Sequence, residues 1–200
     1  MLGPRSNYFI PESYVIREDA PHFDDTPFQD EYQDDVYREA RKLFMEHGFK
    51  TVVDYGCGSG FKLRKYFSGH QACGIEVEPT LSWLKEKYPD GYWSNDAEAP
   101  PGELLICADV IEHVADPDAF MARIVALKPE LVIISTPACD FLGTENGPPR
   151  NVHHVREWSV SQFGSYMAEW LVVHGHYLPT PGTCCQVVVG RPLRTQERSM

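Results

Sequence analysis

The stretch Val52-Val53-Asp54-Tyr55-Gly56-Cys57-Gly58-Ser59-Gly60 decides the fold class of this chain. Two β-branched residues followed by an acid predict the end of a buried strand, and three glycines at alternate positions predict a turn whose backbone a ligand can approach closely. A helix is expected to follow over residues 60–68, and this order indicates a site for a nucleotide-type cofactor. A dinucleotide fingerprint would need glycine at position 61, where the chain has Phe61, so a nicotinamide cofactor is disfavoured.

Composition and charge bound the class of protein. With 200 residues and 42% apolar content, the chain is long enough for one domain with a sizeable core and too short to predict two. The net charge of −11 is concentrated in residues 1–40, where ten acids stand against three arginines. Because binding to phosphate backbones or anionic membranes depends on lysine and arginine, we expect no nucleic acid and no membrane among the partners. The oligomeric state is left open.

Cysteine usage and apolar run lengths predict the compartment. The six cysteines include no C-x-x-C pair, and most lie in apolar runs such as 104–107, where cysteine acts as a small hydrophobe. No run approaches the roughly 18 apolar residues of a membrane span, and the N-terminus lacks the apolar core of a secretion signal. These features predict a soluble protein of the reducing cytoplasm.

Apolar runs suited to buried strands alternate with helical segments along most of the chain. The expected strands are 50–55, 71–76, 91–95, 103–108 and 130–136, and the expected helices are 60–68, 79–87, 117–127 and 159–170. Near the end, residues 171–178 and 184–189 flank a Pro- and Gly-containing turn at 179–183, which predicts an antiparallel hairpin. The pattern predicts an α/β fold with a doubly wound, Rossmann-like and mostly parallel sheet of seven strands.

The two ends of the chain differ from the alternating part. Residues 1–28 have no clear period and predict an irregular arm that could serve as a lid, residues 29–190 predict the folded domain, and residues 191–200 predict a polar tail. The segment Thr26-Pro27-Phe28-Gln29 predicts a capping box with proline at the first position of an amphipathic helix, which would end at Gly48.

Polar residues follow each expected strand at the same edge of the sheet, where ligands of doubly wound folds bind. Asp54 ends the first strand, and Glu76 ends the second, twenty residues after Gly56, at the separation where a carboxylate can accept the ribose hydroxyls. Asp96 follows the third strand and could read an adenine edge, while Asp109 follows the fourth.

These segments resemble the class I S-adenosylmethionine-dependent methyltransferases. The similar stretches are V-V-D-Y-G-C-G-S-G, G-I-E-V-E, N-D-A, D-V-I-E-H-V-A-D-P and V-I-I-S-T-P, in order, over roughly residues 40–190. The resemblance implies methyl transfer from S-adenosylmethionine, with Asp54 and the loop 56–60 holding the methionine part, Glu76 the ribose, and Asp96 with Ala97 the adenine. The expected cofactor residues are Asp54, Gly56, Cys57, Gly58, Gly60, Glu76, Asp96, Ala97, Ala108 and Asp109.

Methyl transfer from a sulfonium is an in-line displacement, so the enzyme mainly aligns an acceptor and removes its proton. His113, His153 and His154 are therefore the candidates for a catalytic base. Each of them could also serve only to line the pocket or to order a loop.

A metal site is a second interpretation of the same residues. Asp109, Glu112 and His113 have i, i+3, i+4 spacing, which one helical turn would put on one face. They resemble the E-x-x-E-H of metal-dependent O-methyltransferases of the ubiquinone-biosynthesis type and of small-RNA 2′-O-methyltransferases, and the segment from His154 to Trp158 resembles the second histidine segment of the latter. Aspartate at 109 is one methylene shorter than the glutamate of that motif, so a divalent metal at Asp109, Glu112, His113 and His154 and a purely structural role both stay open.

The acceptor is the least determined part of the function. Tyr14, Arg17 and Gln33 are candidate lid or substrate residues, because the segment before the first strand often shapes acceptor choice in the family that the chain resembles. O-methylation of a small molecule or sugar, within glycan or natural-product biosynthesis, is the leading hypothesis. Alternatives are N-methylation of a small molecule, or a non-catalytic partner protein that binds the cofactor.

Overall fold

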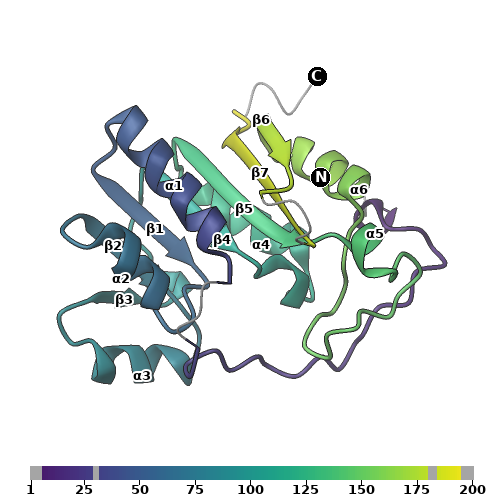
Figure 1. Cartoon of the computed structure of the whole chain (residues 1–200), viewed down its shortest axis with the longest axis horizontal. Helices are drawn as coiled ribbons and strands as arrows, with labels where there is room; N and C mark the ends of the chain where they lie inside the picture. The colour runs from purple at the N-terminus through teal and green to yellow at the C-terminus, as the bar shows by residue number, and fades with distance from the viewer. Residues whose placement is uncertain (1–5, 29–31, 180–183, 195–200) are drawn as a thin grey trace.

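The computed structural model describes residues 6–28, 32–179 and 184–194, and the strands in these ranges form one sheet (Figure 1). They are β1 (Thr51–Tyr55), β2 (Gln71–Ile75), β3 (Tyr92–Ser94), β4 (Leu104–Ala108), β5 (Leu131–Pro137), β6 (Leu171–Tyr177) and β7 (Cys185–Pro192). The order in the sheet is β3-β2-β1-β4-β5-β7-β6, with β7 antiparallel to β5 and β6 and the other pairs parallel. The predicted fold class, including the antiparallel C-terminal hairpin, is confirmed.

Helices cover both faces of this sheet. They are α1 (Asp34–His47), α2 (Phe61–Phe67), α3 (Thr80–Lys87), α4 (Pro117–Ala126), α5 (Cys139–Leu142) and α6 (Val160–Ala168), with 3-10 turns η1 (Ser6–Phe9), η2 (Asp96–Glu98) and η3 (Ile111–His113). One face is packed by α1, α2 and α3 through residues such as Phe44 and Leu84, and the other by α4 and α6 through Met121 and Phe163. Because both faces are covered, β4 and β5 are buried along their whole length.

The start of α1 differs from the sequence prediction. Thr26 does not cap a helix; its hydroxyl donates to Asp24 at 2.7 Å, in a turn. The helix begins at Asp34, after Gln33 has adopted a left-handed φ of 66° without a side-chain cap. The Gln33 amide instead donates to the carbonyl of Ala108 at 3.2 Å. The prediction is wrong here because a contact with a distant strand end overrides the local capping pattern.

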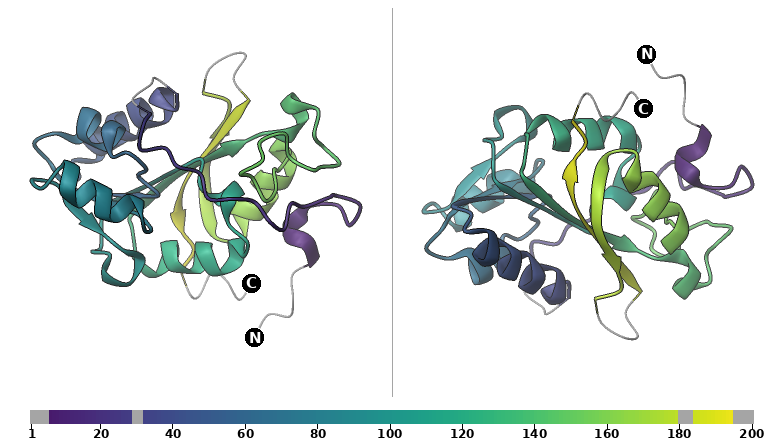
Figure 2. Two further views of the ribbon diagram at one scale, coloured as in Figure 1. Left: turned by 90° about the horizontal axis from the view of Figure 1, so that it is seen from below. Right: turned by 90° about the horizontal axis from the view of Figure 1, so that it is seen from above.

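Residues 8–28 form a strap that runs along the carboxyl ends of the parallel strands (Figures 1 and 2). Toward its start, the Arg17 N–H donates to the carbonyl of Val155 at 2.9 Å. At its other end, the Ser59 hydroxyl donates to the carbonyl of Phe28 at 2.9 Å. The strap is thereby fastened on both sides of the sheet edge where ligands of this fold class bind.

The C-terminal strand is longer than the sequence predicts. β7 runs to Pro192, into the segment predicted as a polar tail from residue 191, while residues 195–200 lie outside the described ranges. Most of the predicted turn at 179–183 also lies outside them. None of the described helices has both the length and the apolar character needed to cross a membrane.

The start of α6 yields a stability prediction. Ser159 Oγ accepts the N–H of Gln162 at 3.3 Å, and the Gln162 side chain accepts the N–H of Ser159 at 2.8 Å. Ser159→Ala removes this cap and should lower the free energy of unfolding by about 1 kcal/mol in urea denaturation. Ser165→Ala, within the same helix, should change it by less than about 0.5 kcal/mol. Equal values for the two variants would contradict the capping role.

Candidate functional site

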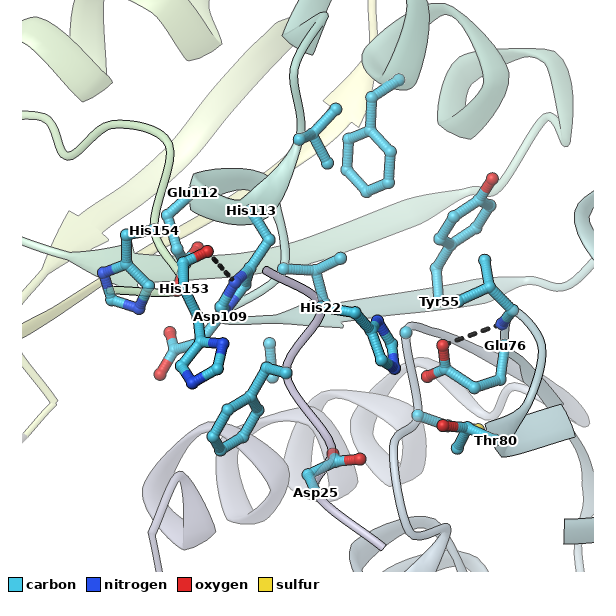
Figure 3. A pocket seen from close by; sticks show the side chains of 18 of the residues that line it. His22, Asp25, Tyr55, Glu76, Thr80, Asp109, Glu112, His113, His153 and His154 are labelled. Atoms are coloured by element: carbon cyan, nitrogen blue, oxygen red, sulfur yellow. Dashed lines mark hydrogen bonds between the residues drawn. The ribbon is translucent and has the colours of Figure 1, made fainter. Parts of the chain in front are cut away.

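A cavity of about 780 Å³ opens at the carboxyl edge of the sheet (Figure 3). It lies where β1 and β4 are neighbours and the chain leaves them toward opposite edges of the sheet, which is the ligand-binding crevice of doubly wound folds. Its walls come from the glycine loop (residues 56–60), the ends of β2 and β4, the loop after β5, and the strap. Of the predicted cofactor residues, those that line the cavity are Gly56, Cys57, Glu76, Asp96, Ala108 and Asp109.

The glycine loop is shaped by backbone geometry that side chains disfavour. Gly56, Gly58 and Gly60 have φ values of 80°, 53° and 67°. The N–H groups of Gly56 and Cys57 both donate to the carbonyl of Ile75, at 2.9 and 3.2 Å. These bonds hold the loop against the end of β2.

Asp54 lies behind the glycine loop and is not among the residues that line the cavity. Its exposed fraction is 0%. The Tyr37 hydroxyl donates to Oδ2 at 2.9 Å, and Oδ1 has no hydrogen-bond partner among the described residues. Burial raises the pKa of Asp54 to about 7, and the hydrogen bond from Tyr37 opposes this shift. Asp54 therefore underlies the loop that the cofactor is expected to contact.

Glu76 lines the cavity at the end of β2. One carboxylate oxygen accepts the N–H of Gly58 at 2.9 Å, and the other accepts the N–H of Val77 at 2.8 Å. Burial raises the pKa of Glu76, while these two N–H donors lower it. The carboxylate is held beside the glycine loop, a position that suits the predicted ribose role.

Asp96 lines the cavity beyond the end of β3. It accepts a hydrogen bond from the hydroxyl of Tyr55 and forms an ion pair with Arg123. Ala97 is exposed in η2 and is not among the lining residues. Each oxygen of Asp96 has one protein partner and keeps a second lone pair, so the carboxylate can still accept a hydrogen bond from adenine.

Asp109 does not belong to the helical turn that the sequence predicts. It has a left-handed φ of 53°, and η3 begins only at Ile111, so the expected common face with Glu112 and His113 is wrong for Asp109. The Ser135 hydroxyl donates to Oδ1 of Asp109 at 2.6 Å, and Oδ2 has no hydrogen-bond partner among the described residues. The contact with the neighbouring strand fixes this conformation.

The other three predicted metal ligands come together. One ligand atom each from Glu112, His113 and His154 lies within 4.8 Å of the others, and Asp109 is not part of this cluster. Glu112 is fully buried; Thr136 donates to its Oε2 at 3.0 Å, and its Oε1 has no partner among the described residues. Burial, followed by the charge of Asp109, raises the pKa of Glu112 well above its usual range. Such a carboxylate suits a cation.

Both histidines of the cluster have hydrogen-bond partners that favour ligation. The Nδ1 atom of His113 lies 2.8 Å from the carbonyl of His153, so it carries the proton and Nε2 keeps a lone pair. Burial lowers the pKa of His113 to about 4. His154 Nδ1 lies 2.7 Å from Glu157, and its Nε2 lies 2.9 Å from the Asn151 amide, which a metal would replace. Two imidazoles, one carboxylate and a carboxylate behind a histidine fit a divalent transition metal.

The strap covers the cavity above these histidines. The ring of Phe23 is nearly parallel to that of His113, with centroids 6.1 Å apart, and meets His153 edge-on at 5.1 Å. His153 Nδ1 lies 3.0 Å from the carbonyl of Pro21, so Nδ1 is the donor and Nε2 carries the lone pair. His153 thus lines the cavity and is held by the strap through its Nδ1 atom.

The three predicted lid residues have different positions. Gln33 lines the cavity, but Tyr14 and Arg17 do not. Tyr14 is buried, and its hydroxyl accepts the N–H of Glu157 at 2.9 Å. The Arg17 guanidinium donates to the carbonyl of Pro149 at 2.8 Å. Tyr14 and Arg17 fasten the strap to the loop after β5.

The cavity also has lining residues that the sequence did not identify as site residues, among them His22, Asp25, Lys62 and Asn151. His22 and Asp25 lie on the strap, whose sequence has no period from which a position could be derived. Asn151 stands three residues before His154, a spacing at which an amide can bond an imidazole, and this signal could have been used.

Comparison with known proteins identifies the family. Residues 29–195 match a family model described as a methyltransferase domain. The chain is 25% identical over 203 residues to a small RNA 2′-O-methyltransferase of Arabidopsis thaliana; the match covers 76% of this chain and 22% of that protein, so the chain spans about a fifth of the length of this curated relative.

Solved structures share the fold. The small RNA methyltransferase HEN1 superposes with a TM-score of 0.61 at 21% identity, over 82% of this chain and 25% of that one. The 1,6-didemethyltoxoflavin-N1-methyltransferase of Burkholderia thailandensis, with bound S-adenosylhomocysteine, gives 0.59 at 20% identity, over 83% and 82%. The chain belongs to the methyltransferase-domain family, which confirms the predicted family and enzyme class. The S-adenosylhomocysteine bound in the Burkholderia structure agrees with the predicted cofactor.

The burial of Asp54 predicts a pH dependence of stability. Its pKa is about 7 in the folded state and about 3.9 when unfolded, so the folded protein keeps a proton that the unfolded chain releases between these values. The free energy of unfolding of the ligand-free protein, relative to that of Asp54→Asn, should therefore fall as the pH rises from about 4 to about 7, by about 3–5 kcal/mol. Urea denaturation across this range measures it, and a constant difference would contradict the shifted pKa.

The position of Glu76 predicts its contribution to cofactor binding. Glu76→Gln replaces a carboxylate that can accept two hydroxyl hydrogen bonds, and we expect the Kd of both S-adenosylmethionine and S-adenosylhomocysteine to rise by about 10- to 100-fold. Isothermal titration calorimetry measures both values. Glu86→Gln, on the exposed face of α3, is the matched control and should leave them unchanged.

Proposed function

We propose that this methyltransferase transfers the methyl group to a hydroxyl oxygen of a small molecule or sugar, assisted by a divalent metal at Glu112, His113 and His154. The observation that carries the proposal is the convergence of these three ligand atoms within 4.8 Å beside the cofactor cavity. A hydroxyl is a poor nucleophile at neutral pH and needs polarisation or deprotonation, whereas a neutral amine already offers a lone pair. The cluster therefore supports oxygen over nitrogen as the acceptor atom.

The residues around the cluster support its role in ligation. A divalent ion bound there would polarise the acceptor hydroxyl and lower its pKa. Glu157 orients His154 through the 2.7 Å contact, and the His153 carbonyl fixes the tautomer of His113. Two imidazole ligands favour manganese, iron, cobalt or zinc over magnesium, which prefers oxygen ligands.

His153 is the base in this mechanism. The acceptor oxygen forms a bond to the methyl carbon while the carbon–sulfur bond breaks, and S-adenosylhomocysteine leaves with the electron pair of that bond. The acceptor hydroxyl gives its proton to Nε2 of His153, whose Nδ1 proton is held by the carbonyl of Pro21. The strap contact thus sets the tautomer that this step needs.

Three classes of methyl acceptor are compatible with this fold: hydroxyl compounds, RNA and amines. The net charge of −11 favours a small molecule over a polyanion, although the Arabidopsis relative is named for methylating small RNA. N-methylation is the nearest alternative, since the Burkholderia structure is of an N1-methyltransferase. All six cysteines are free thiols, which supports a reducing compartment such as the cytoplasm.

Metal removal tests the proposal. Formation of S-adenosylhomocysteine should be measured with a panel of sugars and other hydroxyl compounds, amines and a short RNA. We expect turnover with a hydroxyl compound, a loss of at least about 100-fold in excess EDTA, and recovery with Mn²⁺ but not Mg²⁺. Full activity in EDTA would remove the metal from the proposal. Transfer only to amines, only to RNA, or to no acceptor would overturn the proposed acceptor.

A binding measurement separates ligation from folding. Calorimetric titration of Mn²⁺ into the protein should show one site that is lost in His113→Ala and His154→Ala. His174→Ala, an exposed histidine on β6, is the matched control and should bind Mn²⁺ as the unmodified protein does. Retention of Mn²⁺ binding in both cluster variants would contradict the assignment of these ligands.

A further inference from the structure

Three carboxylates converge where the glycine loop meets the cavity, and the strap supplies one of them. They are Asp54 behind the loop, Glu76 at the end of β2, and Asp25 on the strap. The charge of Asp25 is felt at both of the others, since it contributes to raising the pKa of Asp54 and of Glu76. In Figure 3 the Asp25 carboxylate is directed toward the side where Glu76 and Thr80 lie. Carboxylates brought together in this way favour a cationic ligand.

Asp25 rests directly on the glycine loop. A β-carbon built on Gly58 would overlap Oδ2 of Asp25, so the carboxylate occupies the space that any side chain at position 58 would need. The hydrogen bond from the Ser59 hydroxyl to the Phe28 carbonyl fastens the strap beside this contact. The absence of a side chain at Gly58 therefore serves the approach of the strap.

Of the three carboxylates, Asp25 is the one best placed to contact a ligand in the cavity. Asp54 has no exposed surface and does not line the cavity. Both oxygens of Glu76 accept backbone N–H groups, from Gly58 and Val77, and their remaining lone pairs are assigned to the ribose hydroxyls. Asp25 lines the cavity, as does Lys62, whose positive charge acts on Asp25. This end of the cavity thus holds a carboxylate and a positively charged ammonium group. These two charges complement the α-ammonium and α-carboxylate groups of an amino acid.

We propose that Asp25 binds the α-ammonium group of the methionine part of the cofactor, so that the strap completes the cofactor site. Lys62 faces the α-carboxylate in this arrangement. The strap is fastened at Ser59 on one side of the cavity and at His153 on the other, and these contacts hold Asp25 over the glycine loop. The inference concerns the cofactor alone and does not depend on the acceptor or on the metal.

Three ligands, two with the amino-acid end and one without it, test this assignment. S-adenosylmethionine and S-adenosylhomocysteine carry the α-ammonium group, whereas 5′-methylthioadenosine keeps the adenosine and sulfur but lacks the amino-acid end. In calorimetric titrations in EDTA, Asp25→Asn should raise the Kd of the first two by about 10-fold and leave that of 5′-methylthioadenosine unchanged. Asp24→Asn is the matched control on the same strap, because Asp24 bonds Thr26 and does not line the cavity; it should change none of the three.

The outcomes separate binding from folding. An equal loss for all three ligands in Asp25→Asn would mean that Asp25 only holds the strap in place, and would overturn the proposal. Unchanged binding of S-adenosylmethionine would overturn it as well. Since no acceptor or metal is present in these titrations, a failure of the proposed O-methylation would leave their result intact.

Discussion

The parallel pairing of β1 with β4 is the constraint on which the site depends. Their register, with Asp54 opposite Ile106, brings the carboxyl ends of both strands to the same edge of the sheet. The chain then leaves β1 toward β2 and β4 toward β5, so the glycine loop and the η3 turn diverge and leave a crevice between them. A slip of one residue would turn the side chains of β1 to the opposite face of the sheet, and Asp54 would no longer lie beneath the loop. The cofactor residues and the histidine cluster share one cavity for this reason.

Local sequence signals predict most of the fold. The strands and most helices follow from apolar periodicity; Glu76 directly follows β2, and Asp96 lies two residues beyond the end of β3. Such signals fail where a distant contact sets the backbone. Gln33 reaches the carbonyl of Ala108, 75 residues away, which moves the start of α1, and the contact with Ser135 fixes Asp109 outside the helical turn. Neither partner can be identified from the spacing of nearby residues.

The strap shows a second limit of the same kind. Its sequence carries neither helical nor strand periodicity, and its path is fixed by contacts such as Arg17 with Pro149, 132 residues apart. The lack of a period predicts an irregular arm that could serve as a lid, but it does not say which side chains point inward. Tyr14 and Arg17 became fasteners, while Asp25 entered the cavity. The presence of an irregular covering segment can be predicted from the sequence. The contacts of its individual residues are known only from the folded structure.

The folded structure also changes how the negative charge of the first part of the chain is interpreted. Residues 1–40 carry ten acids and three arginines, a net charge of −7 at neutral pH. Asp25 lines the cofactor cavity, and Asp34 is buried with an ion pair to Lys65 at 2.6 Å, while Asp35 pairs with Arg38 on the surface. Long-range steering of a charged partner depends on the field outside the protein. Acids that face a cationic cofactor or a lysine contribute little to that field. The net charge of a segment therefore predicts its partners only when such neutralised acids are left out of the count.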